Sequence, residues 1–197
     1  MKSAIMQPYL FPYIGYFQLI TTVDHFVFYD DVNFIKRGWI NRNRILIDGK
    51  DELVTIPLIK ASQNKLINEI DIFCDANLRK KIISKIEYAY KKAPFYEEVI
   101  ELIRNIINAD ISNIGEYAAN SVVSVSKYLE INTQFHFSSI LSPESKGMDK
   151  ADRLIYICQN LETEKYINSI GGQALYKKKY FLDNQIDLSF IETLDFE

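Results

Sequence analysis

The chain has 197 residues, of which 48% are hydrophobic and 25% are charged, so it is a globular protein and not a disordered, collagen-like or mucin-like chain. A formal net charge of -3 is too balanced for a general nucleic-acid or membrane-surface binder, so we expect any anion site to be local. The two cysteines stand alone without metal-ligand spacing, and no apolar run is long enough to span a membrane. We therefore expect a cytoplasmic protein with no bound metal.

The N-terminal segment predicts a strand, a loop, a helix and a second strand. Residues 3–6 are a short apolar run, after which Pro8 and Pro12 prevent a helix until Ile14 or Gly15. A helical stripe follows, and the aromatic and β-branched run 25–29 is typical of a buried strand. A strand, helix and strand in this order form a βαβ unit, which favours a parallel sheet with a right-handed crossover.

The middle of the chain predicts a hairpin followed by helices. Residues 43–47 and 52–58 flank Asp48-Gly49, a strong hairpin signal, and residues 67–73 alternate like a further strand. From residue 78 to about 130 the hydrophobic period is that of three helices, divided at Pro94 and near residue 111. After them we predict a strand at 134–138, a helix at 149–161 and strands at 165–169 and 187–191.

These elements predict an α/β protein whose mainly parallel, Rossmann-like sheet is built from both ends of the chain. We expect a single domain over residues 1–197, with a β-hairpin excursion and a helical insertion at about 78–130. Ligands of such sheets bind beyond the carboxyl ends of the strands. We therefore expect loops 7–15, 30–44 and 169–176 to meet at one edge and to form the site.

The first of these loops offers an amide and a helix start. Gln7 stands at a strand end, Pro12 stiffens the backbone, and Gly15 lets a ligand approach the free N–H groups of the following helix. Tyr9 offers a ring to the same ligand. The alternative is a rigid entry turn that is packed by Tyr9 and Tyr13.

The second loop carries most of the chemistry. Asp30 and Asp31 end a buried strand, where a carboxylate can anchor a sugar hydroxyl, hold Mg²⁺ beside a phosphate or act as a base. Side chains that suit phosphate or a planar ring follow: Lys36, Arg37, Trp39, Asn41, Arg42, Asn43 and Arg44. The loop thus predicts a site for a phosphorylated or nucleotide-linked sugar. The alternative is a solvated, salt-bridged basic surface capped by the acidic pair.

The third loop follows a strand and contains a glycine pair. Gly171 and Gly172, flanked by Ser169 and Tyr176, can present backbone N–H groups to a phosphate. The alternative is a tight turn into a short helix from Gln173, with lysines 177–179 as a solvated helix end. The motifs of serine hydrolases, zincins, P-loop kinases and standard dinucleotide folds are all missing from the sequence.

Several segments resemble the WbqC-like family of bacteria. They are QPYLFPYIGYFQLI from Gln7, DDVNFIKRGWINRNRI from Asp30, KKAPFYEEV at 91–99 and RLIYICQNLETEKYINSIGGQALY at 153–176. That family is associated with gene clusters for lipopolysaccharide O-antigen and other surface glycans, so the resemblance implies an enzyme without a settled reaction. Transfer of an acyl or aminoacyl group to an amino sugar is one assignment that fits it. Many members have His where this chain has Met6. The family pattern also continues beyond Glu197, so we expect a shortened or truncated member.

Our leading hypothesis is a transferase that acts on a nucleotide-linked or phosphorylated amino sugar, with no evident cofactor. Phosphate would be held by arginines 37, 42 and 44, a ring by Trp39 and Tyr9, and a proton or hydroxyl by Asp30 or Asp31, while Gln7 and Asn41 orient the acceptor. An ATP-dependent nucleotidyltransferase or ligase that uses Mg²⁺ is one alternative, by analogy with the layout of adenylyltransferase-like enzymes. A non-catalytic sugar-binding scaffold is another, and a homo-oligomer is left open.

Overall fold

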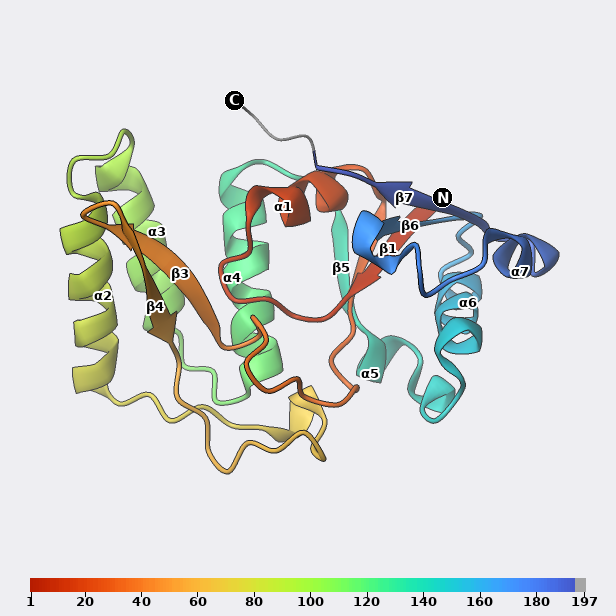
Figure 1. Ribbon diagram of the computed structural model, residues 1–197, viewed down its shortest axis with the longest axis horizontal. Helices are drawn as coiled ribbons and strands as arrows, with labels where there is room; N and C mark the ends of the chain where they lie inside the picture. The colour runs from red at the N-terminus through yellow and green to blue at the C-terminus, as the bar shows by residue number, and fades with distance from the viewer. Residues whose placement is uncertain (194–197) are drawn as a thin grey trace. The chain divides into compact units, whose positions relative to one another are not determined.

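The computed structural model describes residues 1–193 (Figure 1). The chain folds into two compact units, each formed from segments that are distant in the sequence. The sheet unit comprises Met1–Gln7, Pro12–Asp31 and Leu129–Glu197, and the hairpin unit comprises Pro8–Phe11 and Val32–Tyr128. The single domain expected over residues 1–197 stays a prediction.

The sheet unit, as far as residue 193, is built on a five-stranded sheet in the order β5-β2-β1-β6-β7. All neighbouring strands are parallel. The strands are β1 (Lys2–Met6), β2 (His25–Phe28), β5 (Gln134–Phe137), β6 (Lys165–Ser169) and β7 (Asp187–Ile191). This confirms the mainly parallel sheet and the strands that the sequence predicted for both ends of the chain.

Helices on both faces explain why the central strand β2 is buried at every position. Helix α1 (Ile14–Thr21) packs Tyr16 against Phe26 of β2, at 5.3 Å between ring centroids. Side chains of opposite orientation, such as Ile5 and Val27, form a core with α6 (Lys150–Asn160) and α7 (Lys178–Asp183). A strand covered on both faces has no solvated side, so its sequence reads as a continuous apolar run.

The hairpin unit pairs a small antiparallel sheet with three long helices. Strands β3 (Arg42–Ile47) and β4 (Lys50–Thr55) are joined at Asp48 and Gly49, whose φ values of 48° and 77° fit a type I′ turn. The predicted hairpin is confirmed, although β4 ends at Thr55 because Pro57 has no N–H to continue a ladder. The helices are α2 (Ala76–Tyr90), α3 (Tyr96–Ile107) and α4 (Ile114–Tyr128), as the sequence predicted.

Two local predictions are wrong. Residues 67–73 do not form a strand: a 3-10 helix, η1 (Ile67–Glu69), is followed only by isolated bridges at Asp71 and Ile72. The buried Ile67 and Ile70 are three residues apart, so one turn of 3-10 helix brings both into the core. The short helix expected from Gln173 is also absent, because a 3-10 helix, η3 (Ile170–Gly172), precedes that position and α7 begins at Lys178.

The remaining elements connect β5 to β6. Helix α5 (Ser138–Leu141) follows β5 at once, and the 3-10 helix η2 (Pro143–Ser145) leads towards α6. Lysines 177–179 are exposed at the N-terminal end of α7, which confirms the solvated helix end given as the alternative. Within residues 1–193, no helix combines the length and the apolar character that crossing a membrane requires.

Candidate functional site

The strand order of the sheet unit indicates where a ligand would bind. From β1 the chain passes to β2 and β5 on one side, and then returns to β6 and β7 on the other side. The order therefore reverses between β1 and β6, and parallel sheets bind ligands outside the carboxyl ends of the strands at such a reversal. Gln7 follows β1 and the glycine pair follows β6, so the first and third predicted loops begin beside the reversal point.

The acidic pair lies at the same edge, at the end of β2, and is buried. Ser138 Oγ lies 3.1 Å from Asp30 Oδ1 and 2.5 Å from Asp31 Oδ1, so one hydroxyl hydrogen is shared between two carboxylates. The backbone N–H of Ser139 donates to Asp30 Oδ1 at 3.1 Å, and Ser139 Oγ donates to Asp30 Oδ2 at 2.6 Å. Asp30 thus accepts hydrogen bonds from the first turn of α5, where donors have no partner within the helix.

Arg153 of α6 balances the charge of the pair. Its Nη2 lies 2.5 Å from Asp31 Oδ2, and the two side chains are only 5% and 4% exposed. Its Nε donates to Ser145 Oγ at 3.0 Å, and its guanidinium carbon lies 4.7 Å from the centre of the Tyr29 ring. A buried carboxylate is tolerated when it is paired and hydrogen-bonded, and Arg153 meets this requirement for Asp31.

Burial raises the pKa of three tyrosines of the sheet unit. Burial raises the pKa of the Tyr29 phenol above its ordinary value, and Arg153 acts in the opposite direction. Burial also raises the pKa values of Tyr166 and Tyr176. Near neutral pH these phenols therefore stay protonated and do not act as bases.

The other predicted residues of the sheet unit differ in how open they are. A Cβ on Gly15 would lie 2.3 Å from Thr193 Oγ1 and one on Gly172 would lie 2.6 Å from Asn168 Nδ2, so both glycines allow close packing. Gly171 has no such neighbour within 4 Å. Gln7 is half-buried and its carbonyl accepts a hydrogen bond from Tyr16 at 2.9 Å. Pro12 is buried, Ser169 and Tyr176 are half-buried, and the Tyr176 ring packs edge-on against Phe181.

The hairpin unit brings together four other predicted residues. The rings of Tyr9 and Trp39 are stacked, with centroids 6.2 Å apart and an interplanar angle of 14°. The guanidinium carbons of Arg42 and Arg44 lie 5.8 Å and 5.7 Å from the centre of the Trp39 ring. We call these four residues the aromatic–cation cluster.

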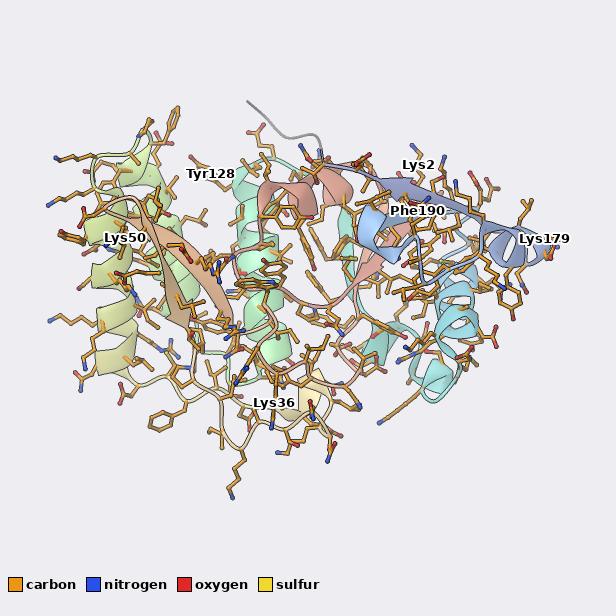
Figure 2. The ribbon with its side chains drawn as sticks, viewed as in Figure 1. Lys2, Lys36, Lys50, Tyr128, Lys179 and Phe190 are labelled. Atoms are coloured by element: carbon orange, nitrogen blue, oxygen red, sulfur yellow. The ribbon has the colours of Figure 1, made fainter. Side chains whose placement is uncertain are left out.

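The remaining residues of the second loop are spread between backbone contacts and solvent. Asn41 Nδ2 donates to Ile56 O at 2.8 Å, and Asn43 Nδ2 donates to the carbonyls of Leu10 and Phe11. These two amides therefore hold the backbone in place. Lys36 and Arg37 are exposed, and Figure 2 shows Lys36 on a loop of the hairpin unit.

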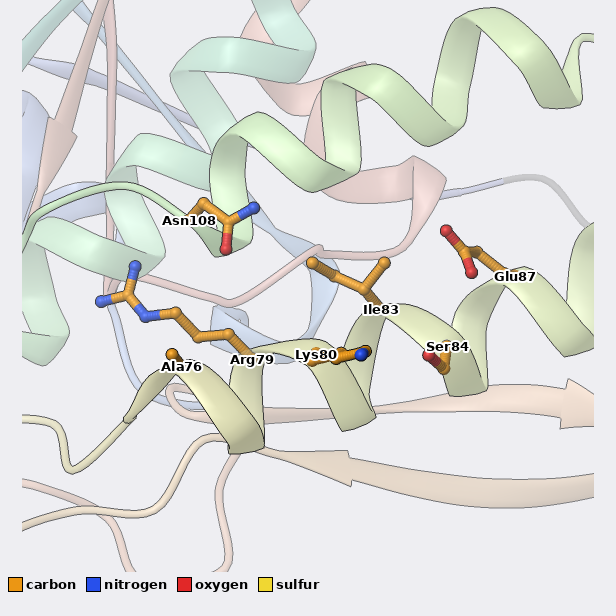
Figure 3. A pocket seen from close by; sticks show the side chains of 7 residues that line it. All are labelled: Ala76, Arg79, Lys80, Ile83, Ser84, Glu87 and Asn108. Atoms are coloured by element: carbon orange, nitrogen blue, oxygen red, sulfur yellow. The ribbon is translucent and has the colours of Figure 1, made fainter.

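A separate hollow lies between α2 and α3. It has a volume of about 380 Å³, and Figure 3 shows Arg79 of α2 and Asn108 among its lining side chains. Arg79 Nη1 donates to Ile107 O at 3.1 Å and to Ala109 O at 2.8 Å, and thus satisfies carbonyls at the end of α3. The seven residues that line the hollow include none of the predicted site residues. We interpret the hollow as a groove of helix packing.

Comparison with known proteins bears out the resemblance on which the sequence analysis relied. The WbqC-like protein family matches residues 7–197, which is nearly the whole chain. The chain belongs to the WbqC-like protein family. It is also 26% identical over 196 residues to "Uncharacterized protein Rv1507c" of Mycobacterium tuberculosis (strain ATCC 25618 / H37Rv). The matched region covers 97% of this chain and 82% of that protein. No solved structure matches the chain.

In this member of the WbqC-like family, three residues that contact the acidic pair, Ser138, Ser139 and Arg153, are absent from the sites predicted from the sequence. Ser138 is the last residue of the strand predicted at 134–138 and Ser139 follows it, so the rule that parallel strands end at one edge already indicated both. Arg153 had no comparable signal, because a charged residue on a predicted amphipathic helix is normally taken to be solvated. The catalytic roles of Asp30, Asp31 and Gln7 stay predictions.

Proposed function

We propose that this WbqC-like protein is a transferase of bacterial surface-polysaccharide synthesis, which moves an acyl or aminoacyl group onto a nucleotide-linked or phosphorylated amino sugar. The observation that supports it is the cluster of Asp30, Asp31, Ser138, Ser139 and Arg153 at the carboxyl edge of the parallel sheet. Sheets with this strand order hold ligands at that edge. The fold alone hosts many reactions, so the proposal rests on the side chains and not on the fold.

The two carboxylates suit different tasks. Asp31 is held by Arg153 in a buried ion pair, so we assign it to positioning. Asp30 accepts a hydrogen bond at 2.6 Å from Ser139 Oγ, and Ser139 is less buried than Ser138. We assign the base to Asp30, with Ser139 as the hydroxyl that meets the acceptor and passes its proton to the carboxylate.

The reaction needs only one such proton relay. The sugar nitrogen attacks the acyl carbon, a nitrogen–carbon bond forms, and the bond from the acyl carbon to the sulfur or oxygen of the donor breaks. The nitrogen loses a proton to Ser139 Oγ, whose own proton moves to Asp30, and the leaving group takes up a proton from solvent. Gln7 orients the acceptor, and the open space beside Gly171 leaves room for it.

The proposal is tested by following turnover with mass spectrometry. The chain is incubated with UDP-, dTDP- and GDP-linked amino sugars or amino-sugar phosphates, together with acyl thioesters, and the expected product is the acylated sugar. Asp30→Asn and Ser139→Ala are each expected to lower kcat by about 10²–10⁴-fold, which is the usual contribution of a general base.

Asp183→Asn is the matched control, because Asp183 is exposed at the end of α7 in the same unit. It is expected to keep full turnover. Turnover that survives Asp30→Asn in folded protein contradicts the assignment of the base. The absence of product from every pair of substrates contradicts the transferase proposal itself.

A second candidate is an ATP-dependent nucleotidyltransferase or ligase. The strand-order reversal beside the open Gly171 loop supports it, because phosphates bind to backbone N–H groups at such points. It predicts Mg²⁺-dependent consumption of ATP, whereas the transferase needs neither. A non-catalytic scaffold predicts sugar binding with no turnover of any donor.

A further inference from the structure

We propose that the aromatic–cation cluster of Tyr9, Trp39, Arg42 and Arg44 is a subsite for a nucleoside diphosphate. The base would stack on the aromatic pair, and the two phosphates would bind the two guanidiniums. This inference rests on the proposed function only for the class of ligand, a nucleotide, and it concerns the hairpin unit by itself. All four residues belong to the hairpin unit.

The aromatic pair offers a flat surface that is reachable from solvent. Trp39 is 39% exposed, although large aromatic side chains are usually well buried. Tyr9 lies nearly parallel to it, with an interplanar angle of 14°. Leu10 N donates to Trp39 O at 3.2 Å, so the backbone ties the segment of Tyr9 to the loop of Trp39.

The two arginines provide one cationic group for each phosphate. Arg42 and Arg44 are two residues apart in β3, so they project from the same face of the strand, and both lie within 6 Å of the Trp39 centre. Guanidinium groups bind phosphate oxygens in a planar fork and also stack on aromatic rings. A monophosphate needs only one such group, so the pair favours a diphosphate.

The present partners of these arginines leave them available. Arg42 donates through Nε to Gly38 O at 2.9 Å and through Nη2 to Arg37 O, and its Nη1 donates to no atom of residues 1–193. Arg44 Nη1 lies 3.2 Å from Asp51 Oδ2, and those side chains are 58% and 68% exposed. An exposed pair of this kind contributes little stability, so a phosphate can replace Asp51.

Two backbone positions beside the cluster are held by side chains of the same unit. Phe11 and Arg37 have φ values of 46° and 61°, a region that non-glycine residues rarely occupy. Asn43 holds the carbonyl of Phe11, and Arg42 holds that of Arg37. Contacts that fix the backbone of a loop before a ligand arrives lower the entropic cost of binding.

Trp39 makes the test direct, because it is the single tryptophan of the chain. The fluorescence of the full chain is followed during titration with UDP, dTDP and GDP, and separately with glucosamine 1-phosphate and with pyrophosphate. We expect one nucleoside diphosphate to quench the fluorescence in a saturable way. Its half-saturating concentration should be at least tenfold lower than that of glucosamine 1-phosphate or of pyrophosphate. The binding is expected to need no Mg²⁺ and to weaken with added salt, because the guanidiniums are exposed to solvent.

Substitutions in β3 separate the cluster from general charge effects. Arg44→Ala is expected to weaken nucleotide binding about tenfold or more, as the loss of a hydrogen bond to a charged group does. Arg42→Lys keeps the charge but loses the guanidinium that holds Gly38 O and Arg37 O while its Nη1 is left for a phosphate, and should weaken binding by a similar factor. Lys50→Ala is the matched control: it removes one charge at the turn end of the same hairpin (Figure 2), and binding should be unchanged.

The outcomes of this titration are separate from those of the turnover assay. Binding that is equal for glucosamine 1-phosphate and the nucleotide, or that survives both arginine variants, overturns the subsite. Turnover of an amino-sugar monophosphate by a chain that binds no nucleotide also overturns it and leaves the transferase standing. Nucleotide binding lost in Arg44→Ala, without any transfer reaction, supports the subsite and contradicts the proposed function.

Discussion

At the scale of single residues, the acidic pair after β2 owes its place to one distant arginine. Asp30 and Asp31 are adjacent in the chain and both are buried, so their burial would be costly without a cation. Arg153 supplies it from α6, 122 residues further along the chain than Asp31. The pair is thus both a structural charge centre and the candidate site, and substitutions must be interpreted with both roles in mind.

The first prediction concerns the stability that depends on this ion pair. Arg153→Met is expected to lower the free energy of unfolding by about 3–5 kcal/mol, because it leaves the buried carboxylate of Asp31 without its partner. Urea denaturation measures the change. Arg44→Ala breaks a largely exposed pair and should cost no more than about 1 kcal/mol. Equal effects of the two substitutions would contradict the interpretation.

The second prediction concerns pH and the contact between His25 and His136. The Nδ1 of His25 lies 3.1 Å from the Nε2 of His136, and burial, with a smaller effect of His25, lowers the pKa of His136 below its ordinary value. The unfolded chain therefore binds this proton first as the pH falls, since its histidines titrate near pH 6.5. The stability from neutral His136 is present above that pH and is lost as the pH falls through the lower pKa of the folded state.

The measurement compares urea midpoints at pH 7.5 and pH 5.5. We expect the wild type to lose stability between them and His136→Gln to lose less, because the substituted side chain does not titrate. An unchanged difference in the variant would mean that other groups carry the pH dependence.

At the scale of elements, the turn of the hairpin depends on one glycine. Gly49 has a φ of 77°, and a Cβ built there meets no atom within 4 Å, so only the backbone conformation opposes a side chain. Gly49→Ala is therefore expected to cost about 1–2 kcal/mol. Gly171→Ala is the control, because that position is equally open and has no left-handed φ, and it should change stability by less than about 0.5 kcal/mol. A similar loss in both variants in urea denaturation would contradict this account.

The elements also show where local sequence patterns were sufficient. Hydrophobic periodicity and turn chemistry were sufficient to predict strands β1 and β2, the hairpin at Asp48-Gly49 and the three helices of the hairpin unit. Residues 67–73 alternate like a strand but form a 3-10 helix with isolated bridges, because burial of Ile67 and Ile70 decided their conformation. Local periodicity does not distinguish a short strand from an irregular segment that buries the same side chains.

At the scale of the whole molecule, ligand binding should appear as increased stability of the chain. A nucleoside diphosphate at 100 times its dissociation constant is expected to add about 2.7 kcal/mol to the free energy of unfolding. Urea denaturation with and without the nucleotide measures this, and Arg44→Ala at the same nucleotide concentration should show a smaller gain. A gain that is identical in the variant would indicate that the nucleotide binds elsewhere.

The sequence by itself determined the α/β class, the strands of the parallel sheet, the hairpin and the family of this protein, because these depend on local spacing and on contiguous motifs. It also indicated the loops that begin at the carboxyl edge, since that follows from parallel strands. Only the tertiary structure decided which partners these loops meet. Asp31 meets Arg153, and Trp39 stacks on Tyr9, through contacts that the folded chain creates between segments that are distant in the sequence.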